Sequence, residues 1–486
     1  MPAIVRGRGH VRVLPDMPGT MPQVSCSRIL SGMTDRREFV ASLVAAGAAL
    51  PLARRLALGW GGAGSRNPPL PSRDQLHWAD LEVGMFVHFA PNTWQEREYD
   101  DRSTPLSSIN PDVDTDQWAS VARDLGARYV VMVAKHVGGF CMWQTRTTDY
   151  GIRNTPWRGG KGDVMADLAA SCRRAGLGLG VYLSPRDDTF GAGNGGRCAT
   201  PERQASYDRL YRAQLTELLT RYGELVEVWF DGSVVVLVGD ILRAHAPHAA
   251  VFQGPHATIR WVGNEDGFAP YPCWNALPRR AAATGEATAK DGDPGGDAWL
   301  PSEVDVSVRR PNWFWSTTDQ ARLLSLEALL EIYYRSVGRG AQLLLNIPPD
   351  RTGRIPAADA ARAKAFGDEV RRRFGRPLAA RSAAGREVVL RLPAPALVDH
   401  VVAEEDLAGG ERVREYWLEG LAGGQWVPLG TGTAIGHQRI QPVPPLCLEA
   451  VRLAVTRSAA PPRIRRLAAF ATGAAPPPTW NDPGPR

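Results

Sequence analysis

Between residues 80 and 350 the sequence alternates apolar, β-branched runs with amphipathic helical stretches, and this alternation limits the folds open to the chain. Strands that are separated by helices form a parallel sheet, because each helix returns the chain to the same edge. Eight strands are predicted, at 84–90, 129–136, 177–184, 225–232, 249–254, 259–265, 304–308 and 342–348, with helices at 116–125, 163–176, 201–222 and 323–337. The predicted fold class is therefore α/β, a (β/α)₈-like TIM barrel.

The pattern changes near residue 380, where short alternating runs replace the helices. These runs are separated by Gly and Pro, which predicts a C-terminal β-sandwich, and they lie at 387–392, 398–403, 412–419 and 451–455. A Gly- and Ala-rich segment at 282–297 is expected to be a mobile loop on the barrel rim. The expected parts are an N-terminal extension (1–67), the barrel (68–376), the sandwich (377–473) and a proline-rich disordered tail (474–486).

The net charge of +6 is confined to the N-terminal extension, where nine arginines face three acidic residues. The rest of the chain is neutral, so no basic face for nucleic acid is implied. Arg36 and Arg37 precede an apolar, alanine-rich run at 40–50, as in a twin-arginine export signal. That run is too short for a comfortable membrane anchor. We therefore expect an exported protein without a membrane anchor after processing, whose true start is Met33.

Six cysteines show no CxxC spacing, which argues against both a zinc site and a disulfide scaffold. They stand at Cys26, Cys141, Cys172, Cys198, Cys273 and Cys447. A twin-arginine substrate folds before export in a reducing cytoplasm, so free buried thiols are expected.

The segment 225–232, LVEVWFDG, is the clearest candidate for chemistry, because a buried strand ends there in a carboxylate. Trp229 and Asp231 share one face of the strand by its period of two, so an indole stands beside the carboxyl. The alternative interpretation is that Asp231 caps the turn or helix that follows.

Other predicted strands also end in polar side chains. Because the carboxyl ends of parallel strands meet at one rim, these side chains are expected to converge on one mouth. They are His88, His136, Tyr182 with Ser184, Asp231, Glu265, Glu303 with Asp305, and Asn346. For any one of them the alternative is a satisfied core histidine or a helix cap.

Asp231 and Glu265 follow the fourth and sixth strands, so their carboxyls can face each other across the mouth. Such a pair suits glycoside hydrolysis, in which one acid is the nucleophile and the other protonates the leaving oxygen. Flat apolar faces for a sugar are expected from Trp229, Trp274, Trp313 and Trp315. His88, His136 and Asp231 are an alternative metal site, but no HxH or HExxH spacing supports it. No cofactor motif is found either.

These residues belong to segments that resemble the family 29 glycoside hydrolases, the retaining α-L-fucosidases. The similar segments occur in family order and include GMFVHFAPNTWQEREY, AKHVGGFCMW, VWFDG, RWVGNEDG, PSEVDVSVRRPNWFW and GRGAQLLLNIPPDRTG. The EVDVS and GNE segments look most like the subfamily that acts on α-1,3 and α-1,4 linkages. The resemblance implies a fucosylated glycan as substrate and no cofactor or metal.

The resemblance also implies roles for single residues. Asp231 corresponds to the nucleophile, and Glu265 to the acid/base, with Glu303 as a rival acid near the rim. Substrate contacts are implied for His88, Glu98, Tyr99, His136, Tyr182, Trp229, Glu303 and Trp313.

Three departures from the family pattern bear on the substrate. The family's KHHDGF is here KHVGGF, so Val137 replaces a sugar-contacting histidine and Gly138 an aspartate. Arg186 stands where SPWD has Trp, and an apolar run at 234–238 replaces a polar loop. Two alternatives to an α-L-fucosidase follow: a sugar-binding protein with weak or lost turnover, and a glycosidase for a related deoxy or galacto-configured sugar.

Replacing both Arg36 and Arg37 by Lys is expected to leave a folded protein in the cytoplasm with its signal uncleaved. The export receptor reads the guanidinium geometry, which lysine lacks. Mass spectrometry of the secreted protein checks this prediction. Peptides from residues 1–32 on the exported protein would contradict both the signal and the start at Met33.

Overall fold

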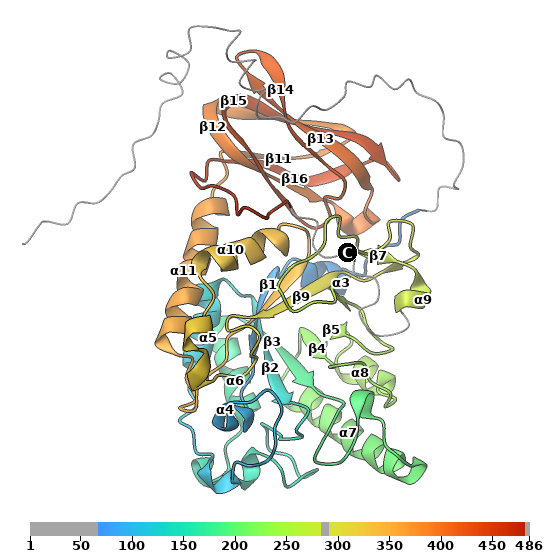
Figure 1. Ribbon diagram of the computed structural model, residues 1–486. Helices are drawn as coiled ribbons and strands as arrows, with labels where there is room; N and C mark the ends of the chain where they lie inside the picture. Colours follow the sequence, from blue (N-terminus) through green and yellow to red (C-terminus); the bar gives the residue numbers. More distant parts are fainter. Residues whose placement is uncertain (1–66, 283–290, 482–486) are drawn as a thin grey trace, which may run out of the picture. The chain divides into compact units, whose positions relative to one another are not determined.

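The computed structural model describes residues 67–282 and 291–481 (Figure 1). The predicted export signal and the start at Met33 lie outside the described residues. No helix among the described residues is long and apolar enough to cross a membrane.

Eight parallel strands form the barrel, in the order β5-β4-β3-β2-β1-β10-β9-β6. A bridge between Phe252 and Ile259 joins the two ends of this sheet and nearly closes it. Each strand falls at a predicted position: β1 (Val83–Val87), β2 (Tyr129–Lys135), β3 (Gly178–Leu183), β4 (Glu227–Trp229), β5 (Ala250–Phe252), β6 (Arg260–Trp261), β9 (Ser302–Ser307) and β10 (Gln342–Asn346). The TIM-barrel prediction is confirmed.

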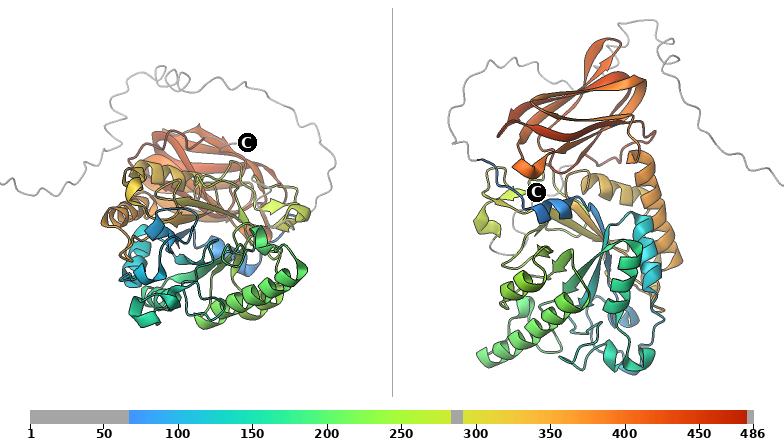
Figure 2. Two further views of the ribbon diagram at one scale, coloured as in Figure 1. Left: turned by 60° about the horizontal axis from the view of Figure 1, so that its bottom comes forward. Right: turned by 180° about the vertical axis from the view of Figure 1, so that it is seen from behind.

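The predicted helices lie outside the strands (Figures 1 and 2). In α5 (Thr115–Leu125), Asp114 caps the first turn and Gly126 ends the helix with a positive φ of 92°. The further helices are α3 (Arg73–Ala79), α4 (Asn92–Gln95), α6 (Val164–Ala175), α7 (Pro201–Arg221), α8 (Gly239–His245), α9 (Arg279–Ala282), α10 (Leu326–Arg335) and α11 (Ala357–Phe374). Two short strands, β7 (Ala276–Leu277) and β8 (Ala298–Trp299), form a separate antiparallel pair.

The period of two along each strand divides the apolar residues between two cores. In β1, Met85 and Val87 pack between the strands and the helices, whereas Phe86 belongs to a cluster inside the barrel. That inner cluster is rich in aromatic rings, among them Tyr129, Tyr182 and Trp229. The barrel interior therefore carries polar atoms as well as apolar surface.

A six-stranded antiparallel sheet follows, in the order β11-β16-β12-β15-β13-β14, and encloses a core of its own. It consists of β11 (Ala379–Ala384), β12 (Glu387–Glu405), β13 (Val413–Ala422), β14 (Gln425–Gly432), β15 (Arg439–Ser458) and β16 (Arg463–Phe470). The long strands β12 and β15 shift register twice along their pairing. The sheet corresponds to the predicted β-sandwich, and the exact domain boundaries stay a prediction.

Polar contacts fasten this sheet to the barrel. The Glu411 carboxylate accepts hydrogen bonds from the backbone N–H (3.0 Å) and the side-chain amide (2.7 Å) of Asn275. Asp80, after α3, lies 2.8 Å from His437 and 2.6 Å from Arg465. These contacts tie the sheet to the barrel at two separate places.

Two expectations need correction, and a third lies largely outside the described residues. The tail is not disordered up to residue 481, because Trp480 packs partly buried against the barrel core and its carbonyl accepts a hydrogen bond from Arg339 (2.8 Å). Residues 283–290 of the predicted mobile loop at 282–297 are not described; beyond them, the Asp291 carbonyl accepts from the backbone N–H of Trp274. Cysteines 141, 172, 198 and 273 are free as expected, but Cys447 is disulfide-bonded.

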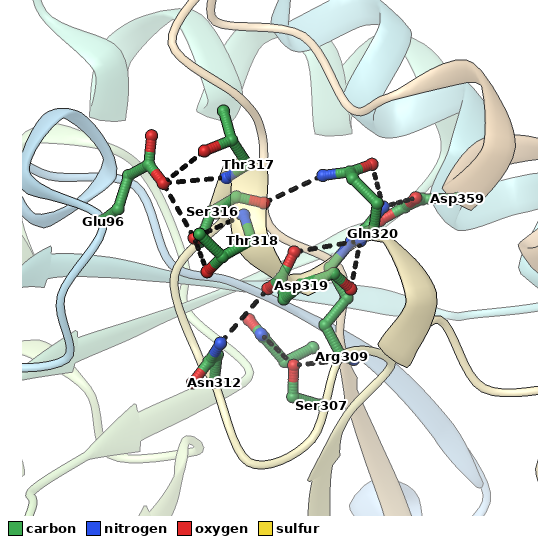
Figure 3. Close-up of polar contacts among 11 residues, drawn as sticks. Glu96, Ser307, Arg309, Asn312, Ser316, Thr317, Thr318, Asp319, Gln320 and Asp359 are labelled. Atoms are coloured by element: carbon green, nitrogen blue, oxygen red, sulfur yellow. Dashed lines mark hydrogen bonds and ion pairs between the residues drawn. The ribbon is translucent and has the colours of Figure 1, made fainter.

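A buried ion cluster fixes the segment after β9 (Figure 3). The Arg309 guanidinium donates to both carboxylate oxygens of Asp359 on α11 (2.6 and 2.8 Å) and to Asp319 (3.0 Å). These three side chains are at most 1% exposed. The nearby Glu96 carboxylate accepts from Ser316 and Thr317, which ties this segment to the loop after α4.

Replacing Arg309 by Met is expected to lower the free energy of unfolding by about 3–5 kcal/mol, because two buried carboxylates lose their cation. Arg97→Met is the control, since its ion pair with Asp101 is exposed and a solvated surface pair adds little stability. Urea unfolding measures both variants. Equal small losses would show that the buried cluster adds nothing beyond a surface pair.

Candidate active site

A cavity of about 300 Å³ opens at the carboxyl ends of the barrel strands. Its lining residues come from the ends of six barrel strands and the loops that follow them. They are Phe86, His88, Glu98, Tyr99, His136, Val137, Tyr182, Trp229, Asp231, Glu265, Asp305, Arg310, Pro311 and Trp313. Nine of the ten predicted site residues are in this set, so the structure brings them together; their individual roles stay predictions.

Asp231 lies directly after β4 at the floor of the cavity. Its carboxylate accepts a hydrogen bond from the Tyr182 hydroxyl (2.9 Å). The turn amides of Gly232 and Ser233 instead donate to the side chain of Gln253 (2.7 and 3.1 Å). Asp231 is therefore not the cap of this turn, and its carboxylate is available to the cavity.

Burial raises the pKa of Asp231, and the hydrogen bond from Tyr182 works against that rise. The negative charge of Glu265 also raises the pKa of Asp231, whereas the guanidinium of Arg186 lowers it. A buried carboxylate held by a neutral hydroxyl keeps more of its reactivity than one paired with a cation. This environment suits a nucleophile.

Aromatic rings form a continuous wall behind Asp231. The rings of Tyr182 and Trp229 stack with centroids 5.2 Å apart, and Trp229 stacks on Phe252 at 3.9 Å. His136 stacks on the other side of Tyr182 at 5.9 Å. Such a wall offers flat apolar surface to the C–H patches of a sugar.

Both cavity histidines are buried and neutral. The pKa of His88 is lowered well below its usual value, chiefly by burial, and burial lowers the pKa of His136 to about 3. His88 Nδ1 lies 2.8 Å from Asn346 Oδ1, while the Asn346 amide donates to Ser307 and Trp313. This arrangement assigns the His88 proton to Nδ1 and leaves Nε2 as an acceptor.

Glu98 and Tyr99 come from the loop after α4. Glu98 accepts a hydrogen bond from the backbone N–H of Trp313 (3.1 Å), and burial raises its pKa to about 7. The His136 Nε2 atom is 3.9 Å from the Glu98 carboxylate. Tyr99 stands at the rim and is 62% exposed.

Glu265 occupies a different environment from Asp231. Its side chain is 41% exposed and forms an ion pair with Arg310 (2.9 Å), which also bonds the neighbouring Asp266 (2.8 Å). The two acids thus share one cavity, with one buried among neutral donors and the other solvated and paired. Environments this different separate the roles of two carboxyls.

Glu303 does not line the cavity, so the prediction that it contacts substrate or serves as a rival acid is wrong in position. Its side chain is fully buried beneath the cavity wall, and its carboxylate accepts a hydrogen bond from the Trp229 indole (2.8 Å). Trp274 and Trp315 also lie outside the lining set. Arg414 stacks over the ring of Trp274 at 4.9 Å.

Two polar residues of the cavity had no role assigned from the sequence. Asp305, which the sequence places at the mouth with Glu303, lies two positions beyond it on the same face of β9. It accepts a hydrogen bond from the Trp261 indole (2.5 Å), and burial raises its pKa to about 7. Arg310 gave no such signal, because its contact with Glu265 depends on how two loops approach each other.

The departures from the family pattern have distinct surroundings. Val137 lines the cavity, whereas a Cβ at Gly138 would lie 2.6–2.7 Å from the Asp100 side chain. Asp100 is fixed there by hydrogen bonds from Tyr150 (2.6 Å) and Gln95 (2.7 Å). A carboxylate from another loop thus takes up the space that a side chain at 138 would fill. Arg186 forms a two-bonded ion pair with Asp188.

Comparison with known proteins points in one direction. The family model for alpha-L-fucosidase matches residues 95–372. Alpha-L-fucosidase 1 from Arabidopsis thaliana is 33% identical over 429 residues, which cover 76% of this chain and 81% of that protein. A crystal structure of a glycoside hydrolase 29 family member from an unknown rumen bacterium is 33% identical with a TM-score of 0.76, and covers 84% of this chain and 78% of its own.

Tyr182→Phe is expected to move the acidic limb of the pH profile of kcat/KM to higher pH. The lost hydrogen bond lowers the pKa of Asp231, so its removal raises that pKa, and a nucleophile must be ionised to react. At the optimum we expect a loss of about tenfold or more.

Steady-state hydrolysis of an aryl fucoside across pH measures this change. Tyr222→Phe is the matched control, because Tyr222 makes the same kind of bond to Asp163 (3.0 Å) away from the cavity. An unchanged acidic limb in Tyr182→Phe would argue against Asp231 as the group that titrates there.

Proposed function

Since this chain belongs to the alpha-L-fucosidase family of glycoside hydrolases and acts on fucosyl residues, we propose that it is a retaining exo-glycosidase for terminal α-L-fucosyl groups of glycans. One observation carries the proposal. Asp231 and Glu265 line the same cavity, in contrasting surroundings and against a wall of aromatic rings. A fucosylated glycan or oligosaccharide is accordingly the substrate, with the α-1,3 and α-1,4 linkages proposed from the EVDVS and GNE segments.

In the proposed first step, an Asp231 carboxylate oxygen attacks the anomeric carbon and the bond to the leaving oxygen breaks. Glu265 gives that oxygen its proton, and a covalent glycosyl-enzyme forms. In the second step Glu265, now ionised, takes a proton from water, and the resulting hydroxide oxygen displaces Asp231 from the same carbon. Two displacements return the anomeric carbon to its original configuration.

Arg310 imposes a condition on this sequence. Its guanidinium engages the Glu265 carboxyl at 2.9 Å, whereas in the first step that carboxyl has to face the leaving oxygen. We infer that the leaving group of the substrate opens this ion pair when it enters. The partner for Arg310 is then Asp266, which it already bonds at 2.8 Å.

Val137 supports a second candidate, a glycosidase for a related deoxy or galacto-configured sugar. An apolar side chain on the cavity wall cannot pair with a hydroxyl, which costs about 1–3 kcal/mol for a sugar that carries one at that place. The same change is the basis for a sugar-binding protein with weak turnover. Both acids remain in the cavity, which favours turnover over binding alone.

We further propose that the protein is exported, on the strength of the arginine pair and the apolar run in the N-terminal extension. Neither lies in the described part of the chain. The substrate would then be met outside the cytoplasm.

A panel of aryl glycosides is expected to give the highest kcat/KM for the α-L-fucoside. In Asp231→Ala the kcat should fall about a thousandfold or more, and azide should restore turnover by replacing the missing nucleophile. Glu265→Gln should affect poor leaving groups most, since they need the proton.

Asp240→Ala is the control, because it removes an exposed carboxylate that pairs with Arg212 away from the cavity. It should leave kcat close to that of the unmodified protein. A better rate with another sugar would favour the second candidate, and an Asp231→Ala variant with near-normal turnover would overturn the nucleophile assignment.

A further inference from the structure

Beneath the cavity, the barrel interior contains a layer of polar side chains. Barrel interiors are ordinarily filled by branched apolar residues, but here Tyr129, Glu227 and Glu303 are fully buried and Gln342 is 3% exposed. They project from four strands: β2, β4, β9 and β10. A buried polar group is costly unless it is hydrogen-bonded, so this layer needs a bonding scheme.

Two glycines make room for the layer. A Cβ at Gly84 would lie 2.4 Å from the ring of Tyr129. A Cβ at Gly180 would lie 3.2 Å from the Cβ of Glu227, which is its register partner on the neighbouring strand. The polar side chains therefore sit in space that small residues leave open, rather than being forced into an apolar core.

Indole and phenol groups supply most of the donors. Glu303 accepts from Trp229 Nε1 through one oxygen (2.8 Å) and from the Tyr129 hydroxyl through the other (3.4 Å). Glu227 accepts from Trp78 Nε1 (3.0 Å) through Oε2. Each oxygen of Glu303 thus has a donor side chain within 3.4 Å.

The second oxygen of Glu227 is the anomaly. Glu227 Oε1 is buried and no side chain or backbone group among the described residues donates a hydrogen bond to it. The Glu303 carboxyl lies within hydrogen-bond reach of Glu227. Two adjacent carboxylates in a dry interior repel strongly, and one proton between them removes the repulsion. Burial raises the pKa of Glu227 to about 7 and that of Glu303 well above its usual range, in agreement with such a proton.

We propose that Glu227 and Glu303 share one proton, held between Glu227 Oε1 and the Glu303 carboxyl, and that this pair acts as a positioning device for Trp229. The Glu227–Glu303 pair is linked to the cavity through Trp229. Trp229 is a wall of the cavity and stacks on Tyr182, the residue that bonds Asp231. Glu303 holds the indole from below, so it sets the plane against which the sugar packs.

The catalytic part of this inference rests on the proposed function, whereas the shared proton and the indole contact do not. Substrate-free measurements therefore come first. Glu227→Gln offers an N–H where the shared proton would be, so its infrared difference spectrum against the unmodified protein should lose a protonated-carboxyl C=O band. The control is Glu369→Gln, where Arg372 and Arg373 lower the pKa of Glu369 to about 2, and only carboxylate bands should disappear.

The indole contact is tested with ¹⁵N-tryptophan-labelled protein. The Trp229 indole N–H resonance, assigned through Trp229→Phe, should move in Glu303→Leu and remain near its original position in Glu303→Gln, whose amide oxygen still accepts. In turnover, Glu303→Leu should raise KM for the aryl fucoside about tenfold or more, and Glu303→Gln should restore it. A merely less stable protein would lower apparent kcat at an unchanged KM.

Each arm can overturn the proposal. If the protonated-carboxyl C=O band persists unchanged in Glu227→Gln, the shared proton is excluded. An indole resonance that does not move in Glu303→Leu would exclude the positioning role. So would a shift of that resonance in Glu303→Gln as large as the shift in Glu303→Leu. If Glu303→Leu does not fold, the indole resonance of Glu303→Gln and the infrared measurement still decide. An unmodified protein that hydrolyses no fucoside would refute the proposed function, while the substrate-free arms would still judge the pair.

Discussion

Closure of the parallel sheet is the constraint on which the cavity depends. The Phe252–Ile259 bridge nearly closes the sheet into a ring. The ring brings side chains from His88 to Trp313 to one rim, although they lie more than two hundred positions apart in the chain. Because all eight strands run in the same direction, their carboxyl ends face one side. The buried Arg309 cluster then fixes the segment after β9, which carries Arg310 and Trp313 to that rim (Figure 3).

The electrostatics of this rim are set by burial of its carboxyls, which accept hydrogen bonds mainly from neutral donors. Burial raises the pKa of Asp231, of Glu98 and of Asp305. Their principal hydrogen-bond donors are a phenol hydroxyl, a backbone N–H and an indole, which satisfy the carboxyls without cancelling their charge. Glu265 alone among the cavity acids has a cation as direct partner. The contrast suits the different tasks that the proposed two-step displacement assigns to the two carboxyls.

The barrel strands were predictable because each is a run of β-branched residues between helical segments. The sandwich was less so: the alanine-rich β11 carries no strand signal, and Pro393 and Pro395 suggest a break where β12 continues with a shift of register. In the site, the strand period correctly places Glu303 inward but does not give its depth. Asp305, two residues further on, reaches the cavity, while Glu303 ends beneath Trp229. How deep a side chain lies in the barrel, and how closely two loops approach each other, depend on packing between segments that are distant in the sequence. No local sequence pattern encodes that packing.

Gly138 shows why single positions of a motif are poor guides to loss of function. A side chain restored at 138 would collide with Asp100, which is already held by Tyr150 and Gln95. The carboxylate is therefore not simply missing from this region, because a different loop provides one. Val137 has no such replacement and exposes an apolar surface to the cavity. The cavity thus keeps Asp231 and Glu265 and carries an apolar side chain at position 137, whereas the change at position 138 is met by Asp100 outside the cavity lining.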